Sequence, residues 1–358
     1  MSSTIKLGNL SLSVFGESHG PAIGAVIDNL PAGIELNFDE ILEFMSRRAP
    51  KKDGTSTMRN EADTPEIISG FYNGKTTGEA LCAIIKNNDQ HSKDYSSISA
   101  LARPGHADYT GYVKYKGAND LRGGGHFSGR LTAPLVFAGA VCGQILEKRG
   151  ITTGAHIYSI GKKKDAAFDP TNLNAEQLNT VKRKYLPVID SSADERMRDV
   201  INNAREDQNS VGGIIECGAV GLECGIGEPI FDGLENRISQ LVFGIPAVKG
   251  IEFGAGFAAA SLFGSENNDE FYMDGDTVKT RTNNAGGILG GISNGMPVIF
   301  RAAIKPTPSI SRPQNTVDFI KKENAVIEIK GRHDPCIVPR AVPCVEAALN
   351  IALMSFLL

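Results

Sequence analysis

Two glycine clusters constrain the folding of this chain more than any other feature of its sequence. Three consecutive glycines occupy positions 123–125, and five more fall between Gly286 and Gly295. Glycine has no Cβ and adopts left-handed backbone conformations readily, so this density excludes a helix interior and predicts close backbone approaches. With 40 glycines but 41% hydrophobic residues, the composition indicates many tight turns, not disorder. The second cluster must approach either another chain segment or a flat ligand.

The charge balance limits the possible partners. Lys and Arg number 37 against 41 Asp and Glu, a net charge of −4. This negative net charge argues against a protein whose main function is binding nucleic acid or an anionic membrane. An anionic ligand would therefore need a local cluster of arginines. The six cysteines form no C-x-x-C pair, which predicts neither a disulfide framework nor a zinc site. They are Cys82, Cys142, Cys217, Cys224, Cys336 and Cys344.

The N-terminus lacks the long apolar stretch of a signal peptide. Two apolar segments, 131–146 and 341–358, are shorter than the ~20 residues of a membrane span and are therefore expected to be buried core helices. We expect a soluble, cytoplasmic protein.

Short apolar runs and helix caps predict the secondary structure. Strands are expected at 10–15, 22–28, 66–72, 81–86, 211–222, 297–304 and 325–330. Caps with an acid three residues later predict helix starts at Asn37, Ser192 and Asp232. The helices at 131–149 and at the C-terminus are apolar nearly all round, so each should be covered on more than one side.

Strands and helices do not alternate as in a doubly wound sheet, which predicts an α+β or layered arrangement. We find no repeat and no linker, so residues 1–358 are expected to form a single domain. The polar segment 161–174 is expected to be a mobile insertion.

Four histidines lie in glycine- or proline-punctuated polar segments, where a rigid scaffold can present them. They are His19, His106, His126 and His333. A lone histidine is more often structural, but four in this setting favour a functional site. Six arginines, two that end a predicted helix (47 and 48) and four beside these segments, are suited to phosphate and carboxylate, although surface pairing with acids is their usual role. They are Arg47, Arg48, Arg103, Arg122, Arg130 and Arg332.

Two backbone features also suit phosphate. Exposed N–H groups of 123–125, ahead of a helix beginning near Ser128, would form an anion site. In the segment KPTPSI, Lys305, Thr307 and Ser309 could hydrogen-bond a phosphate. The same sequence is also typical of an ordinary extended loop.

Two further motifs could indicate a binding site. The residues from Gly254 to Ala259 match the dinucleotide fingerprint G-x-G-x-x-A, but the chain that follows leaves no room for a crossover helix and second strand. A small-residue packing surface is the better interpretation. His106 with Asp108 and His333 with Asp334 could ligate a metal, but no H-x-x-x-H or H-E-x-x-H motif accompanies them, so no metal site is predicted.

Taken together, six segments of the chain resemble the signature blocks of the chorismate synthase family, in the family's order. They are FGESHG (15–20), RPGHADYTGYVKY (103–115), LRGGGHFSGR (121–130), GGILGGISNG (286–295), IKPTPSI (304–310) and KGRHDPCIVPRAVP (330–343). The resemblance implies conversion of 5-enolpyruvylshikimate-3-phosphate to chorismate, the last step of the shikimate pathway, by a carbon–oxygen lyase acting on phosphates. In this anti-1,4-elimination, phosphate leaves C3 and a proton leaves C6. The reaction requires reduced FMN, although it involves no net redox change. The resemblance does not decide whether this chain reduces the flavin with NADPH or depends on a separate reductase.

The resemblance also implies roles for individual residues. His19 would serve as acid for the leaving phosphate, and His106 would protonate or stabilise the reduced flavin near N1. Asp334 would assist proton removal, with flavin N5 as the immediate base. The substrate would be bound by Arg48, Arg130 and Arg340. The FMN contacts would be Arg48, His126, Phe127, Ser128, Pro246, Ala247, Gly290, Lys305, Pro306, Thr307, Pro308, Ser309 and Arg332.

The family fold implied is a β-α-β sandwich, with helices between antiparallel sheets, in a homotetramer. The chain departs from the family pattern at 126–128, where His-Phe-Ser replaces the Arg-Ser-Ser of many members. A titratable ring in place of a fixed cation predicts weaker phosphate or flavin affinity as pH rises. It also departs after Arg48, where Lys51, Lys52 and Asp53 interrupt the pattern R-R-x-P-G-x-S.

Two other functions remain as alternatives. One is a non-catalytic flavin-binding protein, such as a carrier or sensor, which would not need His19, Asp334 or the substrate arginines. The other is a nicotinamide dehydrogenase built on the fingerprint at Gly254. Turnover of the enolpyruvyl substrate would distinguish all three.

Overall fold

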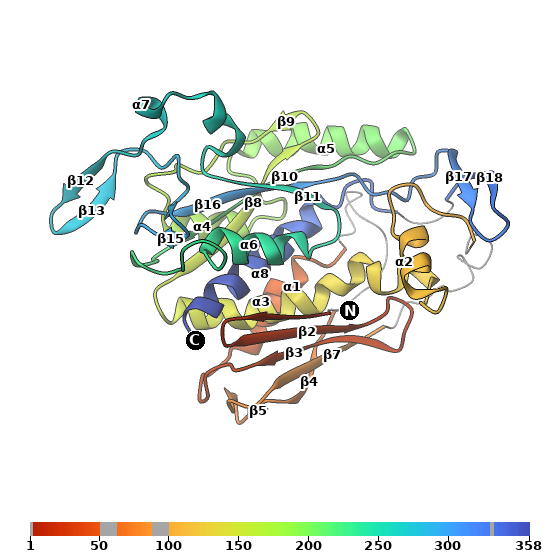
Figure 1. Ribbon diagram of the computed structural model, residues 1–358, viewed down its shortest axis with the longest axis horizontal. Coiled ribbons are helices and arrows are strands. Elements are labelled where there is room, and N and C mark those ends of the chain that lie inside the picture. Colours follow the sequence, from red (N-terminus) through yellow and green to blue (C-terminus); the bar gives the residue numbers. More distant parts are fainter. Residues whose placement is uncertain (1–2, 51–62, 88–99, 330–332) are drawn as a thin grey trace.

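Two five-stranded antiparallel sheets enclose a layer of helices (Figure 1). The computed structural model describes residues 3–50, 63–87, 100–329 and 333–358. Arg332, expected to contact FMN, and the interrupting residues Lys51, Lys52 and Asp53 lie outside the described residues. The layered α+β arrangement predicted from the sequence is confirmed.

The first sheet has the strand order β1-β2-β3-β7-β4. Its strands are β1 (Thr4–Leu7), β2 (Leu10–Gly16), β3 (Ala22–Asp28), β4 (Glu66–Ser69) and β7 (Leu81–Lys86). The second sheet has the order β11-β16-β10-β8-β9. Its strands are β8 (Thr152–Ile160), β9 (Lys163–Lys164), β10 (Gly213–Val220), β11 (Val248–Phe253) and β16 (Val298–Ile304). The predicted apolar runs fall on strands, whereas β1, β8 and β9 were not predicted.

Four short antiparallel hairpins complete the described strands. They are β5 (Phe71–Tyr72) with β6 (Lys75–Thr76), β12 (Phe271–Asp274) with β13 (Thr277–Thr280), β14 (Ile288–Leu289) with β15 (Ile292–Ser293), and β17 (Gln314–Asp318) with β18 (Glu323–Ile327).

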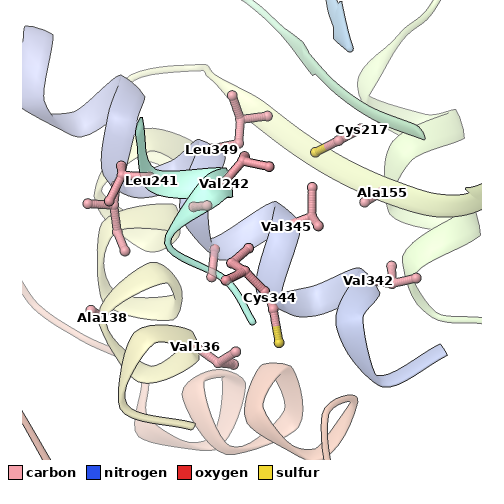
Figure 2. Packing of buried hydrophobic residues seen from close by; sticks show 14 of the residues in the cluster. Val136, Ala138, Ala155, Cys217, Leu241, Val242, Val342, Cys344, Val345 and Leu349 are labelled. Carbon is pink, nitrogen blue, oxygen red and sulfur yellow. The ribbon is translucent and has the colours of Figure 1, made fainter. Parts of the chain in front are cut away.

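The helix layer consists of α1 (Phe38–Ser46), α3 (Thr132–Glu147), α6 (Leu234–Phe243) and α8 (Val338–Phe356). Helix α3 packs on β3 and β7, and α8 packs on β8 and β10, so both sheets contact this layer. Figure 2 shows Val136 of α3, Val242 of α6 and Val345 of α8 in one apolar cluster with Cys217 of β10. The two long helices, α3 and α8, are therefore covered on more than one side, as their all-round apolar character predicted.

One described helix, Gly129–Glu147, is long and apolar enough to cross a membrane by composition, but 83% of its most apolar window is buried inside the protein. Its contact with α8 is close at Gly139, where a Cβ would lie 2.2 Å from Cβ of Ala347. The six cysteines all lie in the described residues and form no disulfide, as predicted.

A further layer, absent from the prediction, covers the outer face of the second sheet. It contains α4 (Ala175–Lys182) and α5 (Ser191–Glu206), which contact β8 and β9. The segment 161–174, which was expected to be mobile, instead forms hydrogen bonds with the residues just before α5. The Asp165 carboxylate accepts hydrogen bonds from the backbone N–H groups of Ile189 (2.5 Å) and Asp190 (2.9 Å), and Phe168 is buried.

The helix caps confirm one prediction and correct two. Asn37 caps α1, accepting from the backbone of Asp39 and Glu40. Helix α5 is capped by Asp190 and not by Ser192, whose hydroxyl donates to the Asp190 carboxylate. Helix α6 starts after Gly233, because the Asp232 carboxylate is engaged by Arg237.

The dinucleotide fingerprint forms no nucleotide-binding unit. Strand β11 pairs antiparallel with β16, and only the short 3-10 helix η4 (Gly256–Ser261) and α7 (Gly264–Asn267) follow it. The remaining described helices border the candidate site: α2 (Asp108–Tyr115), η2 (Arg122–Phe127) and η3 (Gly129–Leu131).

Candidate active site

The glycine triplet brings the two predicted catalytic histidines against one stretch of backbone. Gly123, Gly124 and Gly125 have φ of +59°, +92° and +53°, values that glycine adopts without steric cost. A Cβ at Gly123 would lie 2.0 Å from Cε1 of His19, and one at Gly124 would lie 3.1 Å from Nε2 of His106. The missing side chains therefore give room to two histidines that are 87 positions apart in the sequence.

His19 is buried in the turn after β2, and Ser18 orients its ring. The Ser18 hydroxyl donates to the Arg122 carbonyl (3.2 Å) and lies 3.0 Å from His19 Nδ1. Since that hydroxyl has one proton to donate, it accepts from Nδ1–H in this network. A proton gained by the ring is then carried at Nε2. The backbone N–H of Ser18 also donates to the Gly125 carbonyl at 3.1 Å, which joins this turn to the glycine triplet.

His106 is held by Asp108, which the sequence suggested only as a candidate metal ligand beside it. Its Nδ1 lies 2.7 Å from Oδ1 of Asp108, and Arg103 donates to both oxygens of the same carboxylate, each at 2.7 Å. Burial alone would raise the pKa of Asp108, but the hydrogen bonds from Arg103 and His106 hold it well below its usual range. An ionised Asp108 fixes the Nδ1–H tautomer of His106 and leaves Nε2 on the side of Gly124.

The three predicted substrate arginines form one cluster. Arg48 donates from Nη1 to Oδ2 of Asp63 (2.5 Å), and Arg130 donates to Oδ1 of the same carboxylate. Arg340 donates from Nε to the Arg48 carbonyl (3.0 Å) and from Nη1 to Oδ2 of Asp334 (2.7 Å). The predicted proton-removal residue Asp334 therefore lies within the arginine cluster.

Asp63 is the central acceptor of this cluster, and its side chain is only 1% exposed. Burial alone would raise its pKa, but the charges of Arg48 and Arg130 lower it below the usual value. The carboxylate is therefore ionised at neutral pH. No local motif marks Asp63 in the sequence, because its partners lie 15 and 67 positions away.

Asn87 connects the arginine cluster to the turn that carries His19. Its side-chain oxygen accepts from Nε of Arg130 (3.0 Å), and its amide donates to the carbonyls of Glu17 (3.0 Å) and Gly20 (2.9 Å). Asn87 was not predicted as a site residue.

A second set of contacts connects the cluster to His106. Lys305 donates from Nζ to the Gly105 carbonyl (2.5 Å), beside His106. The Ser210 hydroxyl donates to the Thr307 carbonyl (2.7 Å), and the next residue, Val211, donates its N–H to the carbonyl of Pro335 (2.9 Å). Pro335 follows Asp334, so the contacts form a closed circuit through both histidines, the arginine cluster and the 305–309 loop.

The predicted flavin residues lie partly on this circuit. Ala247 accepts from the N–H of Lys305 (2.9 Å) and has φ +75°, a strained value for a residue with a Cβ. Thr307 has a buried Oγ1 that meets no hydrogen-bond partner among the described residues. Burial, with a contribution from Lys249, lowers the pKa of Lys305.

The glycine cluster at 286–295 supports the first of the two alternatives expected for it, a close approach to another chain segment. A Cβ at Gly286, Gly287 or Gly291 would collide with backbone atoms of other chain segments, so these glycines permit chain packing. Gly290 has φ +63°, and its Cβ would meet nothing within 4 Å. Gly290 lies at the turn between β14 and β15, next to the start of α6, where the N–H of Leu234 donates to the Gly291 carbonyl (2.8 Å). The structure therefore does not bring Gly290 to the 305–309 loop, and its contact with FMN stays a prediction.

The segment 126–128 serves the protein's own structure. His126 lies 2.8 Å from the Gly16 carbonyl through Nδ1 and 2.8 Å from the Ser3 hydroxyl through Nε2. Phe127 packs against Tyr115, and Ser128 caps η3. The pH-dependent ligand affinity expected from His126 stays a prediction.

The remaining candidate residues fall into surface or structural roles. Arg47 pairs with Glu346 (2.6 Å), and Arg122 forms an exposed pair with Asp120 (2.8 Å). In the expected anion site, the N–H of Gly124 already donates to the Leu121 carbonyl. Among the described residues, no group of His, Cys, Asp and Glu could hold a metal ion.

The chain is similar to known proteins over nearly its whole length. The sequence profile of the chorismate synthase family matches residues 10–358. A chorismate synthase from Dehalococcoides mccartyi is 45% identical over 98% of this chain and 96% of its own length. Those from Korarchaeum cryptofilum and Thermococcus kodakarensis are each 44% identical over the same shares. A crystal structure of chorismate synthase matches with a TM-score of 0.77 at 29% identity, covering 98% of this chain and 92% of that chain.

Proposed function

The chain belongs to the chorismate synthase family, and we propose that it eliminates phosphate from 5-enolpyruvylshikimate-3-phosphate to give chorismate. The observation that carries this proposal is the closed circuit of contacts through His19, His106 and the arginine cluster. It unites an acid, an oriented imidazole and clustered cations, which the elimination of phosphate from a polyanion needs together.

The arginine cluster is suited to the substrate's charge. The substrate carries two carboxylates and a phosphate, whereas the chain has a net charge of −4 and must attract it locally. Arg48, Arg130 and Arg340 supply three permanent charges in a mostly buried setting, where attraction to an anion is weakly screened. We assign these three arginines to substrate binding.

His19 is the proposed acid for the departing phosphate. Imidazole is the side chain whose ordinary pKa is close to neutral, so it can donate a proton at working pH. The orientation of the ring by Ser18 places that proton at Nε2. Asp334 is the proposed residue for proton removal, and its hydrogen bond to Arg340 keeps it beside the substrate arginines.

The residues near the 305–309 loop fit reduced FMN. When bound, reduced FMN supplies electron density to the breaking C–O bond and receives it back. Lys305 and the unsatisfied Thr307 hydroxyl offer a cation and a hydrogen bond to it. Pro246, Ala247, Pro306, Pro308 and Ser309 complete this surface, and His106, oriented by Asp108, would stabilise the N1 side. Arg48, His126, Phe127, Ser128, Gly290 and Arg332 remain assigned to FMN by resemblance alone.

We further propose a homotetramer that acts in the cytoplasm. Large apolar side chains are exposed on a protruding segment that contains η4, α7, β12 and β13, including Phe257 (83% exposed) and Phe263 (78% exposed) (Figure 1). Such a patch is typical of an interface between protein chains. Light scattering of the purified chain tests this; a monomer at micromolar concentration would contradict it.

An anaerobic assay tests the function. The protein is mixed with chemically reduced FMN and 5-enolpyruvylshikimate-3-phosphate, and phosphate release is followed with chorismate absorbance. Stoichiometric appearance of both products, absent with oxidised FMN, is expected. Tight flavin binding without turnover would contradict the proposal and favour a flavin carrier. Adding NADPH with oxidised FMN then tests whether the chain reduces its own flavin.

A further inference from the structure

The carboxylate of Asp63 separates two of the arginines assigned to the substrate. Each of its oxygens accepts from a different guanidinium group, Oδ2 from Arg48 and Oδ1 from Arg130. Arg48 is also anchored through Nε to the Thr132 hydroxyl (2.8 Å) and through Nη2 to the Gly129 carbonyl (3.1 Å). Arg130 is anchored through Nε to Asn87 (3.0 Å).

An Asp at this position has a cost that calls for an explanation. The carboxylate repels an anionic substrate and removes part of the positive charge that would attract it. Its backbone is also left-handed, with φ +47°, a conformation uncommon for residues other than glycine, although Asp and Asn tolerate it best. Without the carboxylate, two buried guanidinium groups would repel each other across a weakly screened interior.

We propose that Asp63 is a positioning residue for the substrate: it holds Arg48 and Arg130 at a fixed spacing so that both bind the same anion. This rests on the proposed function, which assigns the two arginines to the substrate. Positioning lowers the cost of ordering two long side chains at the moment of binding. The competing idea is that Asp63 occupies the place of a substrate carboxylate and weakens binding.

The substitution Asp63→Asn separates the two ideas. Asn has the same size and tolerates the left-handed backbone, but its amide NH2 is a donor where one arginine needs an acceptor, so one bridge is lost. We expect KM for 5-enolpyruvylshikimate-3-phosphate to rise roughly tenfold to a hundredfold, since a charge-assisted hydrogen bond has about that effect. We expect kcat to fall less than KM rises.

A binding measurement makes the test independent of turnover. Calorimetry with inorganic phosphate as the probe should show a Kd for Asp63→Asn at least fivefold above that of the unaltered chain. If the unaltered chain binds phosphate but does not turn over, the proposed function fails, and this comparison of phosphate affinities still decides the role of Asp63. A lower KM or a lower phosphate Kd in Asp63→Asn would show that Asp63 competes with the substrate, and would overturn the proposal.

Glu216→Gln is the matched control. Glu216 is also a buried carboxylate between two basic side chains, His156 (2.9 Å) and Arg301 (2.8 Å), but it lies on β10 in the second sheet. The control should lower thermal stability while KM stays within twofold of the unaltered chain. An equal rise of KM in both variants would reduce Asp63 to a general stability effect.

Asp63→Glu keeps both oxygens but displaces them by one methylene, so its KM should lie between those of the unaltered chain and Asp63→Asn. Should Asp63→Asn fail to fold, Asp63→Glu decides alone, and a KM within twofold of the unaltered chain would then refute the positioning role.

Discussion

Replacing Gly123 with alanine should disable the acid of the proposed reaction with little loss of fold. The new Cβ would lie 2.0 Å from Cε1 and 2.2 Å from Nδ1 of His19, whereas real Cβ contacts essentially never fall below 3.0 Å. The imidazole must therefore move by about 1 Å or more. A displacement of that size at a reacting group costs roughly a hundredfold in rate, so we expect kcat to fall about a hundredfold.

The stability cost of this substitution should be modest. Gly123 has φ +59°, and a residue with a Cβ in this left-handed conformation costs about 1–2 kcal/mol. The assay is anaerobic phosphate release with reduced FMN at saturating substrate, paired with thermal unfolding of each variant.

Gly129→Ala is the matched control in the same segment, because a Cβ there would meet nothing within 4 Å and the backbone is not left-handed. It should keep kcat within twofold of the unaltered chain. Gly124→Ala, whose Cβ would lie 3.1 Å from the His106 ring, should have an intermediate effect. A kcat within threefold of normal for a folded Gly123→Ala protein would refute the argument that the glycine triplet positions His19.

Three further predictions concern packing, pH and the flavin. Gly139→Ala should lower the free energy of unfolding by about 3 kcal/mol, because the new Cβ would lie 2.2 Å from Cβ and 2.3 Å from Cα of Ala347. Urea titration measures this change, and an unchanged midpoint would contradict the close contact of α3 and α8. Burial alone would lower the pKa of His156, but Asp165 and Glu216 raise it. The protonated His156 ring therefore stabilises the folded protein fully below the unfolded pKa of ~6.5. This stabilisation is lost as pH rises through the raised pKa of the folded protein. Unfolding free energies from pH 6 to 10 should show this decline, and His156→Gln should reduce the slope; equal slopes would count against it. Lys305→Met should weaken FMN binding about tenfold by loss of a charged hydrogen bond, followed by flavin fluorescence, and a change below twofold would remove Lys305 from the flavin site.

Local sequence was sufficient for features whose cause is local. The Asn37 cap of α1 was predictable because the residue that accepts the hydrogen bonds and those that donate them are two and three positions apart. The predicted starts of α5 and α6 were wrong by a residue or two, because Asp190 and Asp232 took part in competing side-chain contacts. Strand β8 escaped notice because its alternation is interrupted by Gly154 and His156.

The signature blocks could be recognised from the sequence, but the sequence did not show which of their residues come together in the folded protein. The sequence by itself determined the layered α+β class, the burial of the two long apolar helices and the residue types suited to a polyanion, since composition and periodicity are properties of the chain. Only the tertiary structure placed His19 and His106 against one glycine triplet and Asp63 between Arg48 and Arg130. These contacts join residues far apart in the sequence, and their distances are fixed by how the sheets and helices pack, which no local pattern encodes.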